Sequence, residues 1–266
     1  MQTLLNTPHE IIQQNILGAA AKAKTRILNI LVLGMMAGAF IAMGAQSSSL
    51  AVHNISNVGL ARTLAGCIFP VGLMMIVFVG GELFTGDCMM SMAWMQRKIH
   101  FADMLRTLVL VYVSNFIGAA LIAFLVAHSG QYDYSSGALG AYTIKVAYGK
   151  VHLSFANALV SGILCNILVC VAVLMAAAAK DIAGKVLAIF FPILAFVVSG
   201  FEHCVANMYY IPAGIFASKN AAYAAKALEL YNIDSTQLSS LNWGSFAISN
   251  LIPVTIGNII GGAMHD

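Results

Sequence analysis

The sequence predicts an all-α membrane protein with six transmembrane helices, arranged as two inverted repeats of three helices. Three observations lead to this fold class. Hydrophobic residues make up 60% of the 266-residue chain and charged residues only 9%, whereas a soluble domain has about 25% charged residues. Six apolar segments reach the length of about 20 residues that a spanning helix needs. Related polar motifs interrupt the second and the fifth of these segments.

The first 26 residues are predicted to form an amphipathic helix on the cytoplasmic surface. Thr7-Pro8-His9-Glu10 has the pattern of a capping box with proline at the first helical position. Ile12 and Ile16 follow at helical spacing, and Lys22 stands near the expected end. Such a helix either lies on the membrane or contacts a neighbouring subunit, and the sequence is compatible with both.

The six spans are predicted to occupy residues 27–264, and residues 1–266 are expected to form a single transmembrane channel domain. The expected bounds are 27–51, 62–95 with a break at 80–82, 102–127, 153–179, 185–216 with a break at 199–207, and 243–264. Each half of the chain therefore has three spans, and the break falls in the middle one.

The distribution of lysine and arginine predicts that both termini face the cytoplasm. The side of the N-terminus has eight basic residues and the opposite side has five. The first set is Lys22, Lys24, Arg26, Arg97, Lys98, Arg106, Lys180 and Lys185, and the second set is Arg62, Lys145, Lys150, Lys219 and Lys226. The connections on the first side are also short, and short loops follow the positive-inside rule best.

Short motifs recur in the two halves of the chain. Val79-Gly80-Gly81-Glu82 is similar to Val198-Ser199-Gly200-Phe201-Glu202, and Ser114-Asn115-Phe116-Ile117-Gly118-Ala119 is similar to Gly257-Asn258-Ile259-Ile260-Gly261-Gly262. Because three spans form each half, the second half must insert upside down relative to the first. In inverted repeats of this kind the broken helices meet near the membrane midplane and form the solute site.

Ionisable side chains at the two breaks indicate the path of the solute, because such residues at membrane depth are functional candidates. Glu82 and Glu202 are expected to accept hydrogen bonds from unwound backbone, and Asp87 is expected to cap the half-helix that follows the first break. His203 can exchange a proton near neutral pH, at an ordinary pKa of about 6.5. We therefore expect His203 and Thr85 to face the solute.

Cysteine usage and motif content predict neither a metal site nor an enzyme. The five cysteines form no CxxC pair and are odd in number, which is atypical of zinc sites and disulfide frameworks. The chain has no HExxH, no paired histidines and no P-loop pattern. The net charge of +3 is small and does not indicate nucleic-acid binding. We expect no metal, no cofactor and no catalytic activity.

Three long motifs resemble the formate/nitrite transporter family. They are Gly81-Glu82-Leu83-Phe84-Thr85-Gly86, Gly162-Ile163-Leu164-Cys165-Asn166-Ile167-Leu168-Val169-Cys170 and Ser199-Gly200-Phe201-Glu202-His203-Cys204-Val205-Ala206-Asn207-Met208. The resemblance covers nearly the whole chain. It implies an aquaporin-like fold in a bacterial cytoplasmic membrane, a homopentamer with one pore in each protomer, and conduction of small monovalent anions.

The flanking residues are similar to the formate-channel branch of that family, notably Asn207-Met208-Tyr209-Tyr210-Ile211-Pro212-Ala213-Gly214 and Asn250-Leu251-Ile252-Pro253. Formate is therefore the expected solute, and nitrite and hydrosulfide are the alternatives within the family. An obligatory proton-coupled formate carrier is a further alternative. A water or glycerol channel is disfavoured because the chain has no Asn-Pro-Ala box.

The resemblance also implies roles for individual residues. Those expected at the pore are Thr85 in the first break, the central histidine His203 with its neighbours Glu202 and Asn207, the vestibule residue Lys150, and Asn166 behind the histidine. Those expected at two hydrophobic constrictions are Phe69, Leu73, Leu83, Phe84, Val169 and Phe196.

A titratable histidine between apolar constrictions suggests a mechanism. A bare anion is expected to stall at rings of Phe and Leu, since these offer no compensating ligand. Lys150 and the positive helix ends would attract the anion. His203, directly or by polarising Thr85 and water, would then favour transfer of a proton to the anion, so that a neutral weak acid crosses the constriction.

Overall fold

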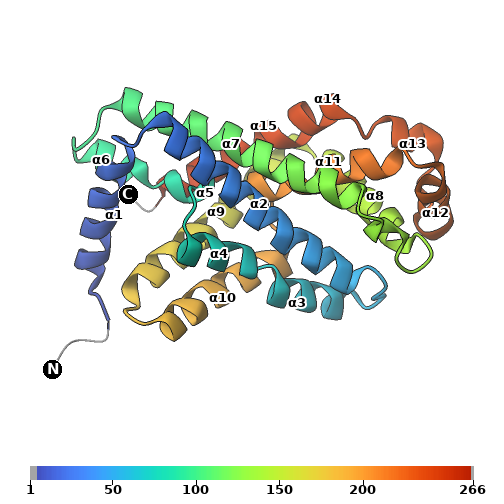
Figure 1. Cartoon of the computed structure of the whole chain (residues 1–266), viewed down its shortest axis with the longest axis horizontal. Coiled ribbons are helices and arrows are strands. Elements are labelled where there is room, and N and C mark those ends of the chain that lie inside the picture. The colour runs from blue at the N-terminus through green and yellow to red at the C-terminus, as the bar shows by residue number, and fades with distance from the viewer. Residues whose placement is uncertain (1–4, 265–266) are drawn as a thin grey trace.

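The computed structural model describes residues 5–264, and the predicted N-terminal segment and sixth span are discussed only within this range. Six helical segments are long and apolar enough to cross a membrane (Figure 1). They are Ile27–Val52, Val58–Val79, Phe101–Ala127, Phe155–Ala178, Ile182–Ser199 and Trp243–Ala263. The second and fifth segments end at the predicted breaks, and the other bounds lie within about four residues of the predicted ones. The predicted all-α membrane fold is therefore confirmed.

The N-terminal helix α1 (Pro8–Lys22) begins at the predicted capping box. The Thr7 side chain accepts a hydrogen bond from the Glu10 amide, and the Glu10 carboxylate accepts one from the Thr7 amide at 2.7 Å. The buried face of α1, which includes Ile16, packs against α6 (Met90–Met95) and α9 (Phe155–Ala178). Helix α1 is therefore docked on the body of the protein, as Figure 1 shows at the left.

The second span is broken near its end. Helices α3 (Val58–Ile68) and α4 (Val71–Val79) form its first part, and the chain resumes as α5 (Phe84–Asp87) and α6. Gly80 ends α4 with a φ of +103°, a conformation that glycine adopts without the penalty of a side chain. Gly80 is therefore the residue at which the second span breaks.

The fifth span is broken in the same way. Helix α10 (Ile182–Ser199) ends at Gly200, whose φ is +73°, and α11 (Cys204–Ser218) begins four residues later. The observed break is shorter than the predicted interruption at 199–207, because His203 caps α11 directly and the next residues are already helical.

The first and third spans of each half pack tightly on each other. Helix α2 (Ile27–Val52) runs along α7 (Phe101–Ala127), and α9 runs along the sixth span. A Cβ atom on Gly118 would lie 2.0 Å from the Met35 carbonyl oxygen, and one on Gly261 would lie 2.3 Å from the Ile163 carbonyl oxygen. Only glycine permits this approach, which is the usual way in which membrane helices pack closely.

The sixth span is interrupted by a widened turn. It consists of α14 (Trp243–Ser245), the π-helix η2 (Phe246–Leu251) and α15 (Ile252–Ala263). Short π-helical turns often occur at functional sites, because they redirect a side chain without ending the helix. The turn here carries the buried residue Asn250.

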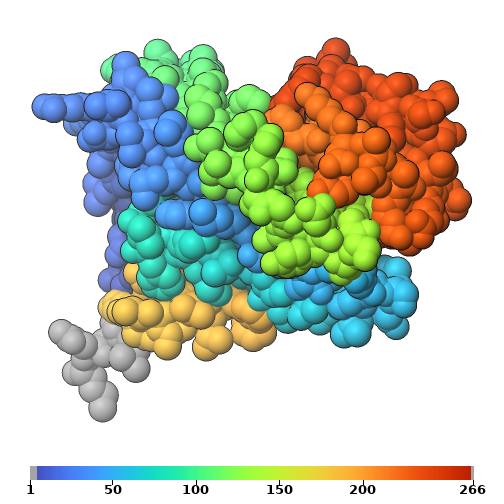
Figure 2. Space-filling model, turned by 45° about the vertical axis from the view of Figure 1, so that its right-hand side comes forward, coloured from blue at the N-terminus to red at the C-terminus, as the bar shows by residue number. Residues whose placement is uncertain are grey.

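The two long connections contain helices that the sequence analysis did not predict. These are η1 (Gln131–Asp133), α8 (Ala138–Val151), α12 (Ala221–Tyr231) and α13 (Ser235–Ser239). In Figure 2 the yellow-green residues around α8 lie between the blue N-terminal helices and the orange-red end of the chain. Three spans separate α1 from α8, so the two helices lie on opposite sides of the membrane. We call these the α1 side and the α8 side.

Candidate functional site

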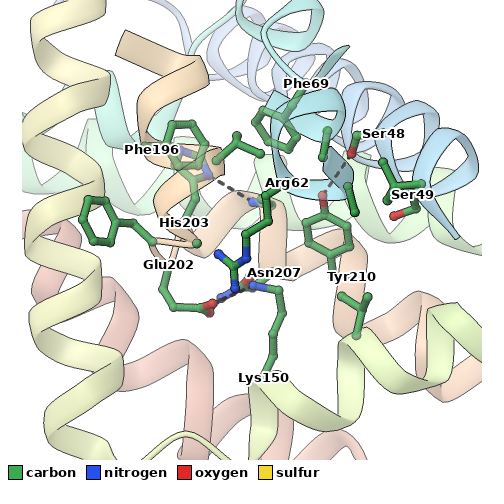
Figure 3. A pocket seen from close by; sticks show the side chains of 18 of the residues that line it. Ser48, Ser49, Arg62, Phe69, Lys150, Phe196, Glu202, His203, Asn207 and Tyr210 are labelled. Carbon is green, nitrogen blue, oxygen red and sulfur yellow. Dashed lines mark hydrogen bonds and ion pairs between the residues drawn. The ribbon is translucent and has the colours of Figure 1, made fainter. Parts of the chain in front are cut away.

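A cavity of about 290 Å³ opens on the α8 side and reaches the break of the fifth span. Its lining includes the residues labelled in Figure 3, which are Ser48, Ser49, Arg62, Phe69, Lys150, Phe196, Glu202, His203, Asn207 and Tyr210. The structure thus brings four of the six predicted polar pore residues and two of the predicted constriction residues to one cavity.

His203 is held in one orientation by both of its ring nitrogens. Nδ1 accepts a hydrogen bond from the Ala206 amide at 3.1 Å, and Nε2 lies 2.9 Å from Thr85 Oγ1. A backbone amide can only donate, so Nδ1 carries no proton and the proton of the neutral ring is on Nε2. Nε2–H therefore donates to Thr85. The hydroxyl proton of Thr85 is then available for another acceptor.

Thr85 lies in α5 and is fully buried. Asn166 of α9 fixes the backbone of this residue, because its Nδ2 donates to the Thr85 carbonyl at 3.0 Å and to the Asn258 carbonyl at 2.6 Å. Asn166 itself is buried and does not line the cavity. Asn166 connects the first break to the sixth span. By fixing Thr85 it also helps to fix the position of His203.

A layer of polar side chains lies on the α8 side of His203. Lys150 Nζ donates to Glu202 Oε1 at 2.7 Å, and Asn207 Nδ2 donates to Glu202 Oε2 at 2.7 Å. Asn250, presented by the π-helical turn, donates to the same Oε2 at 3.2 Å and to the Lys150 carbonyl at 2.9 Å. The carboxylate of Glu202 therefore binds side chains, which corrects the prediction that it accepts hydrogen bonds from unwound backbone.

A corresponding layer lies on the α1 side. Lys22 Nζ is 2.5 Å from Glu82 Oε2 and 2.5 Å from Asp87 Oδ1. Asp87 is the last residue of α5, and the residue at the N-cap position of α5 is Leu83, which makes no side-chain capping bond. The prediction that Asp87 caps this half-helix is therefore wrong, and so is the prediction that Glu82 binds backbone. Both carboxylates instead hold the end of α1.

The unwound backbone is held by two asparagines that the sequence analysis placed only in a repeated motif. Asn115 Nδ2 donates to the carbonyls of Gly34 and Glu82 at 2.8 and 2.9 Å, and Asn115 Oδ1 accepts from the Phe84 amide at 3.0 Å. This one side chain satisfies three backbone groups at the first break, where buried groups without partners are costly.

The second break repeats this arrangement bond for bond. Asn258 Nδ2 donates to the carbonyls of Gly162 and Glu202 at 2.8 and 3.0 Å, and Asn258 Oδ1 accepts from the Cys204 amide at 2.9 Å. The motif 114–119 and its counterpart 257–262 therefore recur because each supplies the side chain that fixes a break.

The repeat also includes the surface helices, which the sequence analysis missed. Lys22 near the end of α1 and Lys150 near the end of α8 each bind the glutamate of a break. A signal for this was present, since Lys22 and Gly34, like Lys150 and Gly162, are 12 residues apart. Each repeat thus consists of one surface helix and three spans.

The predicted constriction residues fall into two groups. Phe69 and Phe196 lie edge to face with ring centroids 5.5 Å apart, and Phe196 also stacks on His203 at 6.0 Å. These two rings narrow the cavity beside the histidine. The other four are buried outside this cavity, and they are Leu73, Leu83, Phe84 and Val169.

Replacing Lys22 by methionine is expected to release α1 from the body of the protein. Burial opposes the charge on Lys22, but attraction by Asp87 and Glu82 outweighs it and raises the pKa of the Lys22 amine. Its removal leaves two carboxylates without a counter-charge, which is costly at a buried site. Hydrogen exchange of the amides of α1 should become at least about tenfold faster.

Lys24→Met is the matched control for this variant, because Lys24 is an exposed lysine just after the same helix. It should leave the exchange of α1 unchanged. Adding Asp87→Asn to Lys22→Met should restore part of the protection, since one of the two uncompensated charges is then gone. Equal exchange in wild type and Lys22→Met would show that apolar packing alone holds α1.

The chain is similar to known proteins over nearly its whole length. The family model described as Formate/nitrite transporter matches residues 9–265. The uncharacterized transporter YrhG of Bacillus subtilis (strain 168) is 39% identical over 260 residues, which cover 97% of this chain and 89% of the relative. The formate channel FocA of Haemophilus influenzae is 36% identical over 248 residues, covering 92% of this chain and 87% of the relative.

A solved structure described as a pentameric formate channel with formate bound is 31% identical to this chain. It superposes with a TM-score of 0.79 and covers 90% of this chain and 94% of its own. The sequence-based resemblance and the three-dimensional similarity therefore point to the same family.

Proposed function

The chain belongs to the formate/nitrite transporter family, and on this premise we propose that it is a formate channel of the bacterial cytoplasmic membrane with both termini in the cytoplasm. The family membership makes it a multi-pass transporter of small anions. Formate as the solute is supported by relatives that are named formate channels. The α1 side is then cytoplasmic, in agreement with its larger number of basic residues.

The functional unit is a homopentamer in which each protomer contains a pore. The similar solved structure is described as pentameric. The isolated protomer also exposes many large apolar side chains on its spans, such as Leu28, Val109 and Phe191. A pentamer covers part of this surface with neighbouring protomers and leaves the rest to lipid.

The observation that carries the proposed mechanism is the hydrogen bond between His203 and Thr85 at the base of the α8-side cavity. An anion at the base of this cavity approaches the pair formed by His203 and Thr85, in which the buried Thr85 oxygen already accepts a hydrogen bond from Nε2–H. Burial between apolar rings disfavours the charged form of the anion and raises its proton affinity. A proton from solution reaches the anion through water ordered by this pair. The neutral acid then crosses the constriction and releases its proton beyond it.

The proposed function is tested by uptake of formate, nitrite and hydrosulfide into proteoliposomes that contain the wild-type protein, measured across pH against empty liposomes. Formate uptake is expected to exceed that of empty liposomes and to increase as the external pH falls, because protonation accompanies passage. A protein that takes up only nitrite or hydrosulfide would contradict formate as the solute. Uptake of none of the three would contradict the channel itself.

Replacing Lys150 by alanine is expected to weaken recruitment of the anion from the α8 side. The change removes the ammonium that faces Glu202 and leaves a buried carboxylate without its counter-charge. The half-saturating formate concentration should increase about fivefold or more, as expected for loss of a partly buried charge. The maximal rate should change less, since the constriction is untouched. An unchanged concentration dependence would show that Lys150 only anchors α8.

A further inference from the structure

The charges of the α8-side cavity do not balance. Its lining contains the two cations Arg62 and Lys150 and the single carboxylate of Glu202. That carboxylate lies 2.7 Å from Lys150 Nζ. Within residues 5–264, no acidic side chain lies at ion-pair distance from Arg62. The uncompensated positive charge of the cavity is therefore the guanidinium of Arg62, a residue that was predicted only as one of the basic residues opposite the N-terminus.

Arg62 is fixed at the break of the fifth span. It extends from α3, and its Nη1 donates to the carbonyl of Val198 in the last turn of α10 at 3.1 Å. A Cβ atom on Gly200 would lie only 2.2 Å from this nitrogen, so the glycine leaves the space that the guanidinium fills. Figure 3 shows Arg62 among the labelled side chains around the cavity. The guanidinium is therefore held next to Gly200, which precedes Glu202 by two residues.

The hydrogen bond to Val198 uses one of the five N–H donors of the guanidinium. The remaining donors form a planar fork, which matches the two oxygen atoms of a carboxylate-like anion, whereas an ammonium group acts as a point charge. A guanidinium bound to backbone at one nitrogen loses little further freedom when it binds an anion. This geometry favours formate and nitrite over an anion with a single binding atom.

Arg62 also stands where two cavities meet. It lines the cavity that leads to His203 and a second one that opens farther out on the α8 side, which also contains Lys145 and Tyr142. Lys145 does not line the inner cavity, and its ammonium lies 4.7 Å from the centre of the Tyr231 ring. An anion that passes from the outer cavity to the histidine therefore passes Arg62.

We propose that Arg62 is the selectivity residue of the α8-side vestibule, where it binds planar anions with two oxygen atoms before they reach His203. This assignment rests on the proposed transport of formate. It assigns Lys150 to neutralising Glu202 and Arg62 to contacting the anion. Loss of either cation lowers the charge of the vestibule by one, but only loss of the guanidinium removes the fork.

The test compares Arg62→Gln, Arg62→Lys and the control Lys145→Gln in proteoliposomes, with formate and hydrosulfide as solutes at one fixed pH. Arg62→Gln should raise the half-saturating formate concentration about tenfold, as expected for loss of charged hydrogen bonds. Arg62→Lys keeps the charge, so the half-saturating hydrosulfide concentration should stay within about twofold of wild type. The half-saturating formate concentration should rise about threefold, because the planar fork is lost. Lys145→Gln should change either value by less than about twofold.

Each outcome separates this inference from the proposed function. If wild type takes up formate and Arg62→Gln has the same half-saturating concentration, the role of Arg62 is overturned and the proposed channel function is not. Equal effects of Arg62→Lys on both solutes would overturn the selectivity. Wild type that takes up no formate would overturn both proposals. Glutamine ends two bonds short of Nη1 and lysine one bond short, so both variants weaken the hydrogen bond to Val198. The elution volume and Tm of the purified oligomer show whether each variant keeps the wild-type structure. If Arg62→Gln does not, the comparison of formate with hydrosulfide in Arg62→Lys tests the role of Arg62.

Discussion

His203→Phe is expected to abolish the pH-dependent component of formate uptake. Phenylalanine keeps an aromatic ring next to Phe196 but removes the Nε2–H donor to Thr85 and any site for a proton. Positioned acid–base groups typically contribute at least about a hundredfold to proton transfer, and a loss of this order is expected at low external pH. The measurement is the initial rate of uptake into proteoliposomes as the external pH is lowered from about 8 to about 5, which raises the supply of protons to the anion.

The same substitution also removes a helix cap, so a structural control is needed. Nδ1 of His203 accepts a hydrogen bond from the Ala206 amide at the start of α11, and loss of such a cap costs about 1 kcal/mol. His203→Asn keeps a good capping side chain but carries no titratable proton. It should preserve the Tm of the oligomer and lose the pH response as Phe does. A wild-type rate and pH profile in both variants would contradict the mechanism.

Asn258→Leu is expected to cost the largest amount of stability of any single change considered. Leucine has a similar size but forms none of the three hydrogen bonds to Gly162, Glu202 and Cys204. Each buried backbone group left without a partner costs about 1–3 kcal/mol, and there is little water at this depth to replace it. The Tm of the oligomer should fall by about 10 °C or more, and formate uptake should be lost with it.

Asn115→Leu should have a similar effect at the other break, because Asn115 makes the equivalent bonds. Ser114→Ala is the matched control. Ser114 is also buried in α7, but within residues 5–264 its hydroxyl donates only to carbonyls of its own helix, at 2.8 and 3.0 Å. This variant should change the Tm by less than about 3 °C. Equal stability of Asn115→Leu and Ser114→Ala would show that the breaks are held by packing rather than by the asparagines.

Much of the fold could be predicted from sequence because hydropathy and helix length report directly on which segments lie in lipid. The six spans, the two breaks and the N-terminal capping box all depend on local patterns. The lengths of the breaks were harder to predict from the sequence. His203 shortens the second break by capping α11, and nothing in apolar periodicity distinguishes such a cap from an unwound residue.

The partners of the polar residues could not be predicted in the same way. Glu82 and Asp87 bind Lys22, which is about 60 residues away in sequence, and no local pattern encodes that contact. Asn250 reaches Glu202 because a π-helical turn redirects it. The pore roles of Thr85 and the constriction residues stay predictions, and the uptake experiments above test them.

The two layers, equivalent by the repeat, differ in formal charge because the α1 side has an additional acid, Asp87, and the α8 side has an additional base, Arg62. On the α1 side Lys22 faces Glu82 and Asp87, which gives a formal charge of minus one. On the α8 side the cavity has two cations and one carboxylate, which gives plus one. The two sides of the protein therefore carry formal charges of opposite sign at these layers. A field of this sign attracts an anion to the α8 side and repels it from the α1 side.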